Sequence, residues 1–429
     1  MKRNTLIVVL IFLIFFVISF LSNILGPIIP DIVDSFDLSL GLAGFMPFAF
    51  FVAYGGMSIP SGLLVEKYRE KKVLLWAFLL AFGGALLFAL LPGFWVALLS
   101  LFLIGIGMAM LQVVINPLLR VAGGESHFAF NSVLAQLFFG AASFLSPLLY
   151  SYLVLNVHTG NDAAHIQLLN SLVPQDLKWV SLYWVFAVIA LLMVVVIRTV
   201  RFPKVELKED EKIEAGSVLR ELLGNRTVLL FFLGIFAYVG TEQGIANWTS
   251  KFLQTYHGAD PATTGASVIS NFWGLLTIGC LLGLALLKFF DSRRVLLLFT
   301  AGAILSLLTA LFGSLSVALI AFPLTGFFAS VMWSIIVSLA LNSVPHHHGT
   351  FSGILCSGIA GGAVVPLLVG GLAEWVGLRL AMLFLFVTLG YIFSIGIWAR
   401  PLVTNATISF KELFPPNRTP ADVQNNPAD

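Results

Sequence analysis

Charged side chains are scarce in this chain. Aspartate, glutamate, lysine and arginine make up 10% of its 429 residues, whereas apolar side chains make up 59%. A soluble domain carries about 25% charged residues, so this composition excludes a soluble globular protein. The net charge of +2 provides no extended basic surface, and we therefore expect no nucleic-acid partner.

Cysteines and nucleotide-binding motifs are also rare or missing. The only cysteines, Cys280 and Cys356, lie in apolar runs, where small core residues are expected rather than a disulfide or a metal site. No Gly-x-x-x-x-Gly-Lys-Ser/Thr motif occurs, which excludes a P-loop ATPase. The run His346–His348 has no partner cluster, so the sequence predicts no enzyme and no resident metal or cofactor.

What the chain does contain is a series of long apolar segments. Each is long enough to cross, as a helix, the roughly 30 Å of a bilayer's hydrocarbon core. The sequence predicts twelve of them, at 5–29, 41–65, 72–91, 95–121, 127–154, 180–199, 227–255, 262–288, 294–313, 316–344, 349–374 and 378–399.

A highly charged stretch at 200–226 divides the twelve segments into six and six. The predicted fold class is therefore an all-α membrane protein, with twelve transmembrane helices in two pseudo-symmetric six-helix bundles. The bundles are expected at 1–199 and 227–400, joined by a cytoplasmic linker at 200–226. The tail at 401–429 is rich in Pro, Asn and Asp and is predicted to be disordered and cytoplasmic.

Lysine and arginine are distributed unevenly along the chain. If the N-terminus is cytoplasmic, 20 of the 23 basic residues fall on the cytoplasmic side, and only Lys178, Lys251 and Arg379 lie outside. This is the positive-inside pattern of membrane proteins. We therefore expect a multi-pass protein of the inner (plasma) membrane, surrounded by lipid, with both termini in the cytoplasm. We also expect it to be a monomer.

The two halves also echo each other in sequence. Gly62 is followed by LLVEKYREKKVLL after the second segment, and Gly283 by LALLKFFDSRRVLL after the eighth. Each echo pairs a glycine with a basic cluster and a new apolar run. Two such halves with a site between them near the midplane are a transporter design. The alternative is that both echoes are the ordinary punctuation of membrane hairpins.

One acidic residue lies deep inside a predicted span. Glu242 sits roughly 22 Å along the helix axis from the start of segment 227–255. An ionisable group in hydrocarbon costs at least about 2.5–3.5 kcal/mol, so it needs a function or a partner. We expect Glu242 to face a central cavity and to act as the ion-coupling residue. The alternative is a neutral glutamic acid that only ties its helix to a neighbour.

Amide and indole side chains form the remainder of the predicted substrate site. Amides offer donors and acceptors together, which suits a hydroxyl-rich ligand, and an indole offers a flat apolar face. For each residue the alternative is an interhelical hydrogen bond or packing, and for Trp248 also anchoring at the membrane interface. The predicted substrate-binding residues are Asn23, Gln112, Asn116, Gln136, Glu242, Gln243, Asn247, Trp248, Asn271, Trp273 and Trp333.

Charged residues at the predicted cytoplasmic turns form a separate group. Glu66, Lys67 and Arg69 follow the second segment, and Arg120 and Glu125 lie between the fourth and fifth. We expect these residues to form salt bridges that gate the protein by holding the loops or halves in one conformation, and not to bind the substrate.

Two parts of the chain resemble a known superfamily. The segment GLLVEKYREKK, from Gly62 to Lys72, resembles the loop signature of the major facilitator superfamily, although Glu66 replaces the usual Asp and Arg69 the second Gly. The run QVVINPLLRVAGGESHFAFNSVLAQLF, which starts at Gln112, is similar to the fucose–proton symporter and glucose/galactose porter family within that superfamily. The resemblance covers roughly residues 5–402.

The resemblance has departures that affect the mechanism it implies. The two proton-handling carboxylates of the fucose symporter would fall at Gly26 and Gln112, and neither residue can titrate. The neighbouring sugar-contact positions match at Asn23 and Gln136. We therefore expect the family's scaffold to carry over, but not its proton mechanism.

The function expected from these features is secondary active transport by alternating access. The chain would import a monosaccharide of the glucose, galactose or fucose class together with a cation. Sodium is favoured, since a carboxylate with amide and backbone oxygens suits a hard cation; a proton is the alternative, since a desolvated glutamate can titrate near neutral pH. The alternative function is export of a drug-like or other small organic solute, which would need a wider and more apolar cavity.

Overall fold

In the computed structural model, which describes residues 5–123, 128–202 and 216–402, all regular secondary structure is helical. Twelve helical stretches of these residues are long and apolar enough to cross a membrane. They confirm the twelve predicted segments. A helix satisfies its backbone polar groups internally, which is what a hydrocarbon environment requires.

Several spans consist of two or more consecutive helices. The N-terminal half contains α1 (Thr5–Ser22), α2 (Leu25–Phe36), α3 (Leu40–Ala43), α4 (Phe45–Tyr68), α5 (Glu70–Leu90), α6 (Phe94–Gly123), α7 (Phe128–Asn156), α8 (Ala164–Leu172), η2 (Gln175–Val180) and α9 (Ser181–Thr199). After the predicted linker, of which the described part includes α10 (Ser217–Gly224), the C-terminal half contains α11 (Arg226–His257), η4 (Pro261–Gly265), α12 (Ala266–Phe289), α13 (Ser292–Phe312), α14 (Leu315–Ala329), α15 (Met332–Leu341), α16 (His348–Ser357), η5 (Gly358–Ala360), α17 (Gly361–Val376), α18 (Leu378–Ala381), η6 (Met382–Phe384) and α19 (Leu385–Trp398). The predicted disordered tail lies almost wholly outside the described residues.

The first span is longer than the sequence predicts. The apolar run indicates an end near residue 29, but α1 and α2 together extend from Thr5 to Phe36. Pro27 does not end the helix, because it lies in the first turn of α2, where backbone N–H groups have no helical partner. The extension brings Asp31 and Asp34 into the span.

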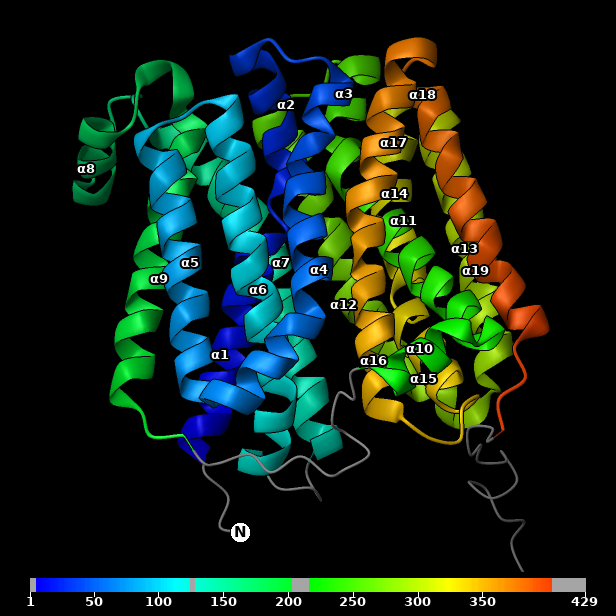
Figure 1. The fold of residues 1–429 in the computed structure, drawn as a ribbon. Helices are drawn as coiled ribbons and strands as arrows, with labels where there is room; N and C mark the ends of the chain where they lie inside the picture. Colours follow the sequence, from blue (N-terminus) through cyan, green and yellow to red (C-terminus); the bar gives the residue numbers. More distant parts are fainter. Residues whose placement is uncertain (1–4, 124–127, 203–215, 403–429) are drawn as a thin grey trace, which may run out of the picture.

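Buried apolar side chains gather in two clusters. One consists almost wholly of residues before 200, and the other mainly of residues after 221. Figure 1 shows the corresponding groups of helices, coloured blue to green on the left and green to red on the right. A few residues cross over, since Ile29 and Val33 belong to the second cluster and Ala262 and Ala266 to the first. These residues mark one place where the halves touch.

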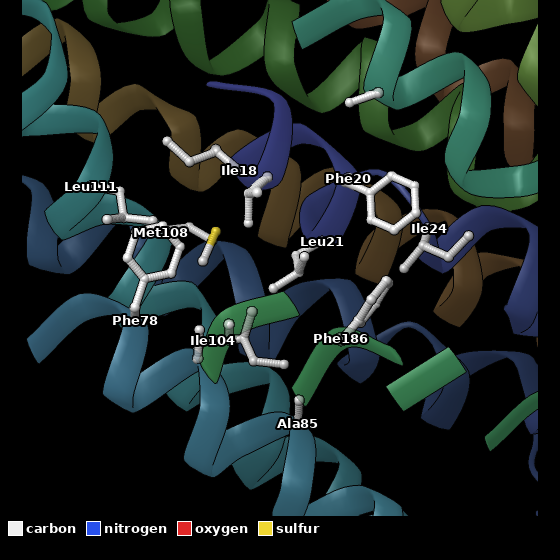
Figure 2. Packing of buried hydrophobic residues seen from close by; sticks show 14 of the residues in the cluster. Ile18, Phe20, Leu21, Ile24, Phe78, Ala85, Ile104, Met108, Leu111 and Phe186 are labelled. Carbon is white, nitrogen blue, oxygen red and sulfur yellow. The ribbon is translucent and has the colours of Figure 1, made fainter. Parts of the chain in front are cut away.

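The interior of the N-terminal half is packed with apolar side chains from four helices. Figure 2 shows Ile18 and Leu21 of α1 among Phe78 of α5, Met108 of α6 and Phe186 of α9. All five side chains are almost fully buried. This side of α1 is therefore committed to its own bundle, and the polar residues of the helix face α7 instead.

Each half contains an equivalent contact at the end of its last helix. In the N-terminal half, Lys71 Nζ donates to the carbonyl oxygens of Arg198 and Val200, at 2.8 and 2.7 Å, at the end of α9. In the C-terminal half, Arg293 Nη1 donates to the carbonyl oxygen of Ala399, at 3.3 Å, at the end of α19. In both cases a basic residue at the start of the third span of that half satisfies free carbonyl groups at the end of the sixth span of the same half. The basic clusters of the sequence echo therefore play the same structural role in each half.

Three spans are interrupted near their middle. The first breaks at Asn23–Ile24, between α1 and α2, and the tenth at Ser330–Val331, between α14 and α15. The eleventh passes through the 3₁₀ turn η5 between α16 and α17. Interrupted helices occur inside membranes where protein groups or a cavity can satisfy the freed backbone. The seventh span, α11, runs without a break.

The two ends of the molecule are named here by the chain. The proximal end carries the start of α1, and the distal end is the opposite one, where α2, α3 and α18 lie (Figure 1). At the distal end α2 packs on α11, and α3 packs on α17. The backbone N–H of Gly41 donates to Glu374 Oε1 at 2.9 Å across this contact. These contacts join the two halves at the distal end.

Candidate functional site

Glu242 lies about half way along the 32-residue helix α11. Tyr238 Oη donates to Glu242 Oε2 at 2.5 Å, and Gln243 Nε2 donates to Oε1 at 3.2 Å. Tyr238 and Gln243 are buried, whereas Glu242 is partly exposed. Each carboxyl oxygen thus has one neutral donor, and no basic side chain among the described residues pairs with it.

The turn of α11 that follows Glu242 touches the N-terminal half. Tyr238, Glu242 and Ala246 are spaced four residues apart and so lie on one side of the helix. The carbonyl oxygen of Ala246 lies against Gly26 of α2, where a side-chain Cβ would collide with it. Glu242 is therefore one turn proximal to the point where the first and seventh spans touch.

Two further spans of the C-terminal half reach the surroundings of Glu242. The ring centroid of Trp333, on α15, lies 6.1 Å from that of Tyr238. Cys280, on α12, is close enough to Glu242 for an electrostatic interaction, and its thiol donates to the carbonyl oxygen of Ser330 at 3.2 Å. Ser330 is the break in the tenth span, so this break lies next to the helix that faces the acid.

In the N-terminal half, a neutral polar cluster surrounds the break in the first span. Asn23 Nδ2 donates to Ser143 Oγ at 2.9 Å and to Ser19 Oγ at 3.3 Å. The hydroxyl oxygens of Ser19 and Ser143 are 2.5 Å apart, and Ser19 also lies within hydrogen-bond distance of the carbonyl oxygen of Phe139. All three polar side chains are buried. The cluster ties α1 to α7 and contains amide and hydroxyl groups only.

Three of the predicted residues have a buried polar atom with no hydrogen-bond partner in the described part of the chain. These atoms are Gln112 Oε1 on α6, Asn247 Nδ2 on α11 and Trp273 Nε1 on α12. A buried unpaired polar group costs about 1–3 kcal/mol, so each such group calls for a water, a ligand or a functional explanation. These three residues have free hydrogen-bonding capacity and come from both halves.

Gln136 and Asn271 lie near the place where α7 of one half crosses α12 of the other. Both residues are exposed. Gln136 is one turn before Gly140, where a Cβ would collide with the side chain of Thr277, and Asn271 is about one turn before Gly274. The structure thus places both amides beside the contact between the halves, and not in hydrogen bonds with Glu242 or Asn23.

The side chain of Trp248 is taken up by packing within its own half. Its side chain is fully buried, and its indole N–H donates to the carbonyl oxygen of Pro366 on α17 at 3.0 Å. It packs inside the C-terminal half, so in this conformation it presents neither a free face to a sugar nor an anchor to the membrane interface.

The predicted gating residues are only partly described. The side chains of Glu66, Asn116 (a predicted substrate residue) and Arg120, and the whole of Glu125, lie outside the described part.

Lys67 and Arg69 can be placed at the proximal end of the second span. Lys67 Nζ lies 5.1 Å from the ring centroid of Tyr68. Arg69 joins α4 to α5 with a φ of 68°, a conformation that favours glycine. The loop thus keeps the backbone shape for which the superfamily signature has a glycine, although arginine stands there.

Sequence reasoning missed a charged group at the distal end. Asp31 accepts a hydrogen bond from Tyr150 Oη at 2.5 Å, and Asp34 pairs with Lys251 across the halves at 3.1 Å. Both acids fall beyond the predicted end of the first span. The available signal was the helical spacing of Asp31 and Asp34, which continues the preceding helix, together with Lys251 as one of only three basic residues predicted outside.

Comparison with known proteins gives consistent results at the level of family and fold. A model of the Major Facilitator Superfamily matches residues 11–360. The glucose/galactose transporter of Brucella abortus is 28% identical over 379 residues, which cover 86% of this chain and 88% of that protein. The L-fucose-proton symporter of Escherichia coli is 25% identical over 367 residues, which cover 82% of this chain and 83% of that protein.

Solved structures show the same fold. The crystal structure of the Escherichia coli fucose:proton symporter has a TM-score of 0.66 at 23% identity and covers 93% of this chain and 100% of that one. A bacterial homolog of the human lysosomal transporter Spinster, in an inward-facing and unoccupied conformation, has a TM-score of 0.75 at 17% identity, covering 92% and 97%. These relatives and neighbours are transporters, not enzymes.

Proposed function

Because this chain belongs to the Major Facilitator Superfamily, we propose that it is a secondary active transporter that moves a monosaccharide by alternating access. The substrate class is that of glucose, galactose and fucose, which the names of its relatives support. The chain's own contribution is a set of neutral amides and hydroxyls around Asn23 and Gln112, groups that match sugar hydroxyls as donors and acceptors.

The orientation proposed from the basic residues places the distal end outside the cell. The conformation described here is then one in which the outer ends of the halves are joined, by α2 on α11 and by α3 on α17. In alternating access these contacts separate when the transporter opens outward. The Asp34–Lys251 pair and the Gly41–Glu374 hydrogen bond would break in that step.

One observation carries the proposal of ion coupling. Glu242 is a partly exposed carboxyl group in the middle of a span, one turn from the place where α11 touches the other half. The side of the membrane from which water reaches a group at this place depends on the conformation, so the ion occupancy of the group is linked to the conformation.

The contacts of Glu242 favour a proton as the coupling ion over the sodium that the sequence favoured. Both carboxyl oxygens already have a neutral donor, Tyr238 on one side and Gln243 on the other. A hard cation is bound by several oxygen ligands, and no group of three or more histidine, cysteine or acidic side chains suited to a metal ion occurs in the described residues. A proton needs only one oxygen.

The test is the variant Glu242→Gln in proteoliposomes, with Glu221→Gln as a matched control, since Glu221 is an exposed acid on α10. Exchange of labelled glucose, galactose and fucose at equal pH measures binding and conformational cycling. Accumulation against an imposed pH or sodium gradient measures coupling. We expect Glu242→Gln to keep exchange but to lose accumulation, and Glu221→Gln to keep both.

Each alternative has its own signature in the same assay. Unchanged accumulation by Glu242→Gln would reject this residue as the coupling group. Accumulation driven by sodium and indifferent to pH would replace the proton with sodium. Transport of lipophilic cations without any hexose exchange would overturn the sugar assignment and favour the exporter.

A further inference from the structure

Asp31 and Asp34 lie about one turn apart on α2 and are held in different ways. Asp34 is exposed and bonds across the halves, to Lys251 Nζ at 3.1 Å and to Gln254 Nε2 at 3.1 Å. Asp31 is partly buried and bonds within its own half, to the hydroxyl of Tyr150. The distal contact thus has one acid paired with a base and one acid whose described hydrogen bond is to a phenol.

The charged groups around Asp31 are mostly acidic. Asp34 shares its helix, Asp176 and Lys178 come from η2 and line the same cavity of about 450 Å³, and Lys251 on α11 and Asp260 before η4 act on it from the other half. Tyr150 is the titratable group that faces it from α7. His257, also on α11, has its ring 5.9 Å from that of Phe252, inside the C-terminal half. Four acids therefore face two lysines.

Joining of the halves leaves Asp31 as the acid with the weakest compensation. Lys251 arrives with α11, but Asp34 and Gln254 engage its ammonium group. Asp260 arrives with η4 and adds another negative charge. A phenol hydroxyl stabilises one carboxyl oxygen but brings no positive charge. A carboxylate that is partly covered and lacks a paired cation lowers its free energy by taking up a proton.

The other three acids have less reason to take the proton. Asp34 is paired with Lys251, and Asp176 is exposed. Asp260 is exposed and caps η4, with its carboxyl oxygens accepting from Ala262 N and Thr263 Oγ1. The cavity of about 450 Å³, which Asp31 lines, gives the proton a route from the distal medium.

We propose that Asp31 is a second proton-binding residue, which takes up a proton when the distal ends of the halves join and thereby stabilises that joined conformation. The inference goes beyond the coupling proposed for Glu242, because Asp31 lies in the distal contact and its described hydrogen bond is to Tyr150, which is not among the groups around Glu242. By linkage, a ligand that binds one conformation more tightly shifts the equilibrium toward it. Low pH on the distal side therefore favours the joined conformation.

The experiment measures the distance between the distal ends without any sugar or gradient. Spin labels are placed at Leu91 and Phe312, which are exposed at the distal ends of α5 and α13, after Cys280 and Cys356 have been replaced by serine. Pulsed electron–electron double resonance at pH 5.5 to 8.5 gives the distribution of distances between the two labels, and from it the ratio of joined to separated molecules. We expect this ratio to fall with rising pH, by at most about tenfold per pH unit, the limit for one linked proton.

Variants assign the response to Asp31. Asp31→Asn mimics the protonated acid and should stay joined at every pH, whereas Asp260→Asn should keep a pH response, with its midpoint at lower pH because one negative charge near Asp31 is lost. Glu242→Gln should also keep it, so failure of the sugar or coupling proposal leaves this test intact. If Asp31→Asn fails to fold, Tyr150→Phe replaces it. Loss of the phenol donor destabilises the ionised form of Asp31, so the midpoint of the pH response in Tyr150→Phe should move to higher pH.

Several results would overturn the proposal. They are no pH response in the unsubstituted chain, the same response in Asp31→Asn, loss of the response in Glu242→Gln alone, or an unmoved midpoint in Tyr150→Phe.

Discussion

The first and seventh spans open the two halves, yet they are built differently. The first breaks at Asn23, and its polar groups there are amide and hydroxyl groups bonded to α7. The seventh, α11, is continuous and carries a carboxyl group at its middle. They touch where Gly26 lies against Ala246, so the two kinds of chemistry lie on either side of one helix contact.

This difference suggests that the N-terminal half mainly binds the sugar and the C-terminal half mainly binds the ion. Neutral groups that both donate and accept suit a sugar, and they can be buried when they satisfy one another, as Asn23, Ser19 and Ser143 do. A carboxyl group suits an ion, and it requires access to water in at least one conformation. Four substitutions probe this comparison, in order of decreasing expected effect.

The largest effect is expected from Gly26→Ala, which acts where the two spans meet. The added Cβ would collide with the carbonyl oxygen of Ala246, and a backbone atom cannot move aside as a side chain can. Overpacking of about 1–3 kcal/mol should slow sugar exchange about 5- to 150-fold by preventing the distal ends from joining. Gly83→Ala, at a glycine with open space around it, is the control. Equal exchange rates for both variants would mean that this contact does not form during transport.

Tyr238→Phe should change proton binding at Glu242 without changing the affinity for sugar. It removes the hydroxyl that donates to Glu242 Oε2. A hydrogen bond to a charged group contributes about 1.5–3 kcal/mol, so the ionised carboxylate loses stability and the proton binds more tightly. The pH midpoint of gradient-driven uptake should therefore rise by about one to two units. A midpoint that stays in place, or a change confined to sugar affinity, would contradict the assignment.

Asn23→Ala should lower the affinity for sugar without changing ion coupling. It removes one neutral hydrogen-bonding group of about 1 kcal/mol, which corresponds to about a fivefold loss of apparent sugar affinity. The accumulation ratio at saturating sugar should stay the same, because Glu242 is untouched. Measuring KM and the accumulation ratio in the same vesicles checks both parts. A variant that lost accumulation but kept its KM would reverse the proposed division.

The smallest effect concerns stability and compares the loops after the second and eighth spans. Arg69 has a φ of 68°, whereas Phe290, its counterpart in the sequence echo, has a φ of −124°. Arg69→Gly should raise the free energy of unfolding by about 1 kcal/mol, because glycine adopts a positive φ without strain. Phe290→Gly should lower it, because the backbone there needs no glycine. Thermal unfolding in detergent reports both changes, and a fall in stability for Arg69→Gly would show that the arginine side chain outweighs the backbone strain.

Several features of the site followed directly from the sequence. Twelve apolar segments were enough to predict the spans, because transfer of a helix into hydrocarbon depends on the composition of that segment alone. Glu242 stood out for the same reason, since a lone acid in an apolar run is costly wherever it sits. Its bond with Tyr238 joins residues four apart on one helix, which is also a local relation.

Other features depended on contacts between distant parts of the chain. The break at Asn23 is stable because Ser143, 120 residues away, satisfies its amide, and no local pattern announces that partner. Trp248 is buried because Pro366 on another span accepts its N–H. Asp31 was missed because an apolar-run criterion stops at polar residues, whereas the helix continues through them once Tyr150 and the opposite half cover it.

The sequence by itself thus determined how many helices cross the membrane and which of them carries a mid-span charge, since both follow from the cost of placing each segment in lipid. The tertiary structure alone decided where helices break, which side chains remain free to bind and which acids meet at the distal contact. Those outcomes depend on packing and hydrogen bonds between residues far apart in the chain, and such pairings are fixed only when the helices pack against one another.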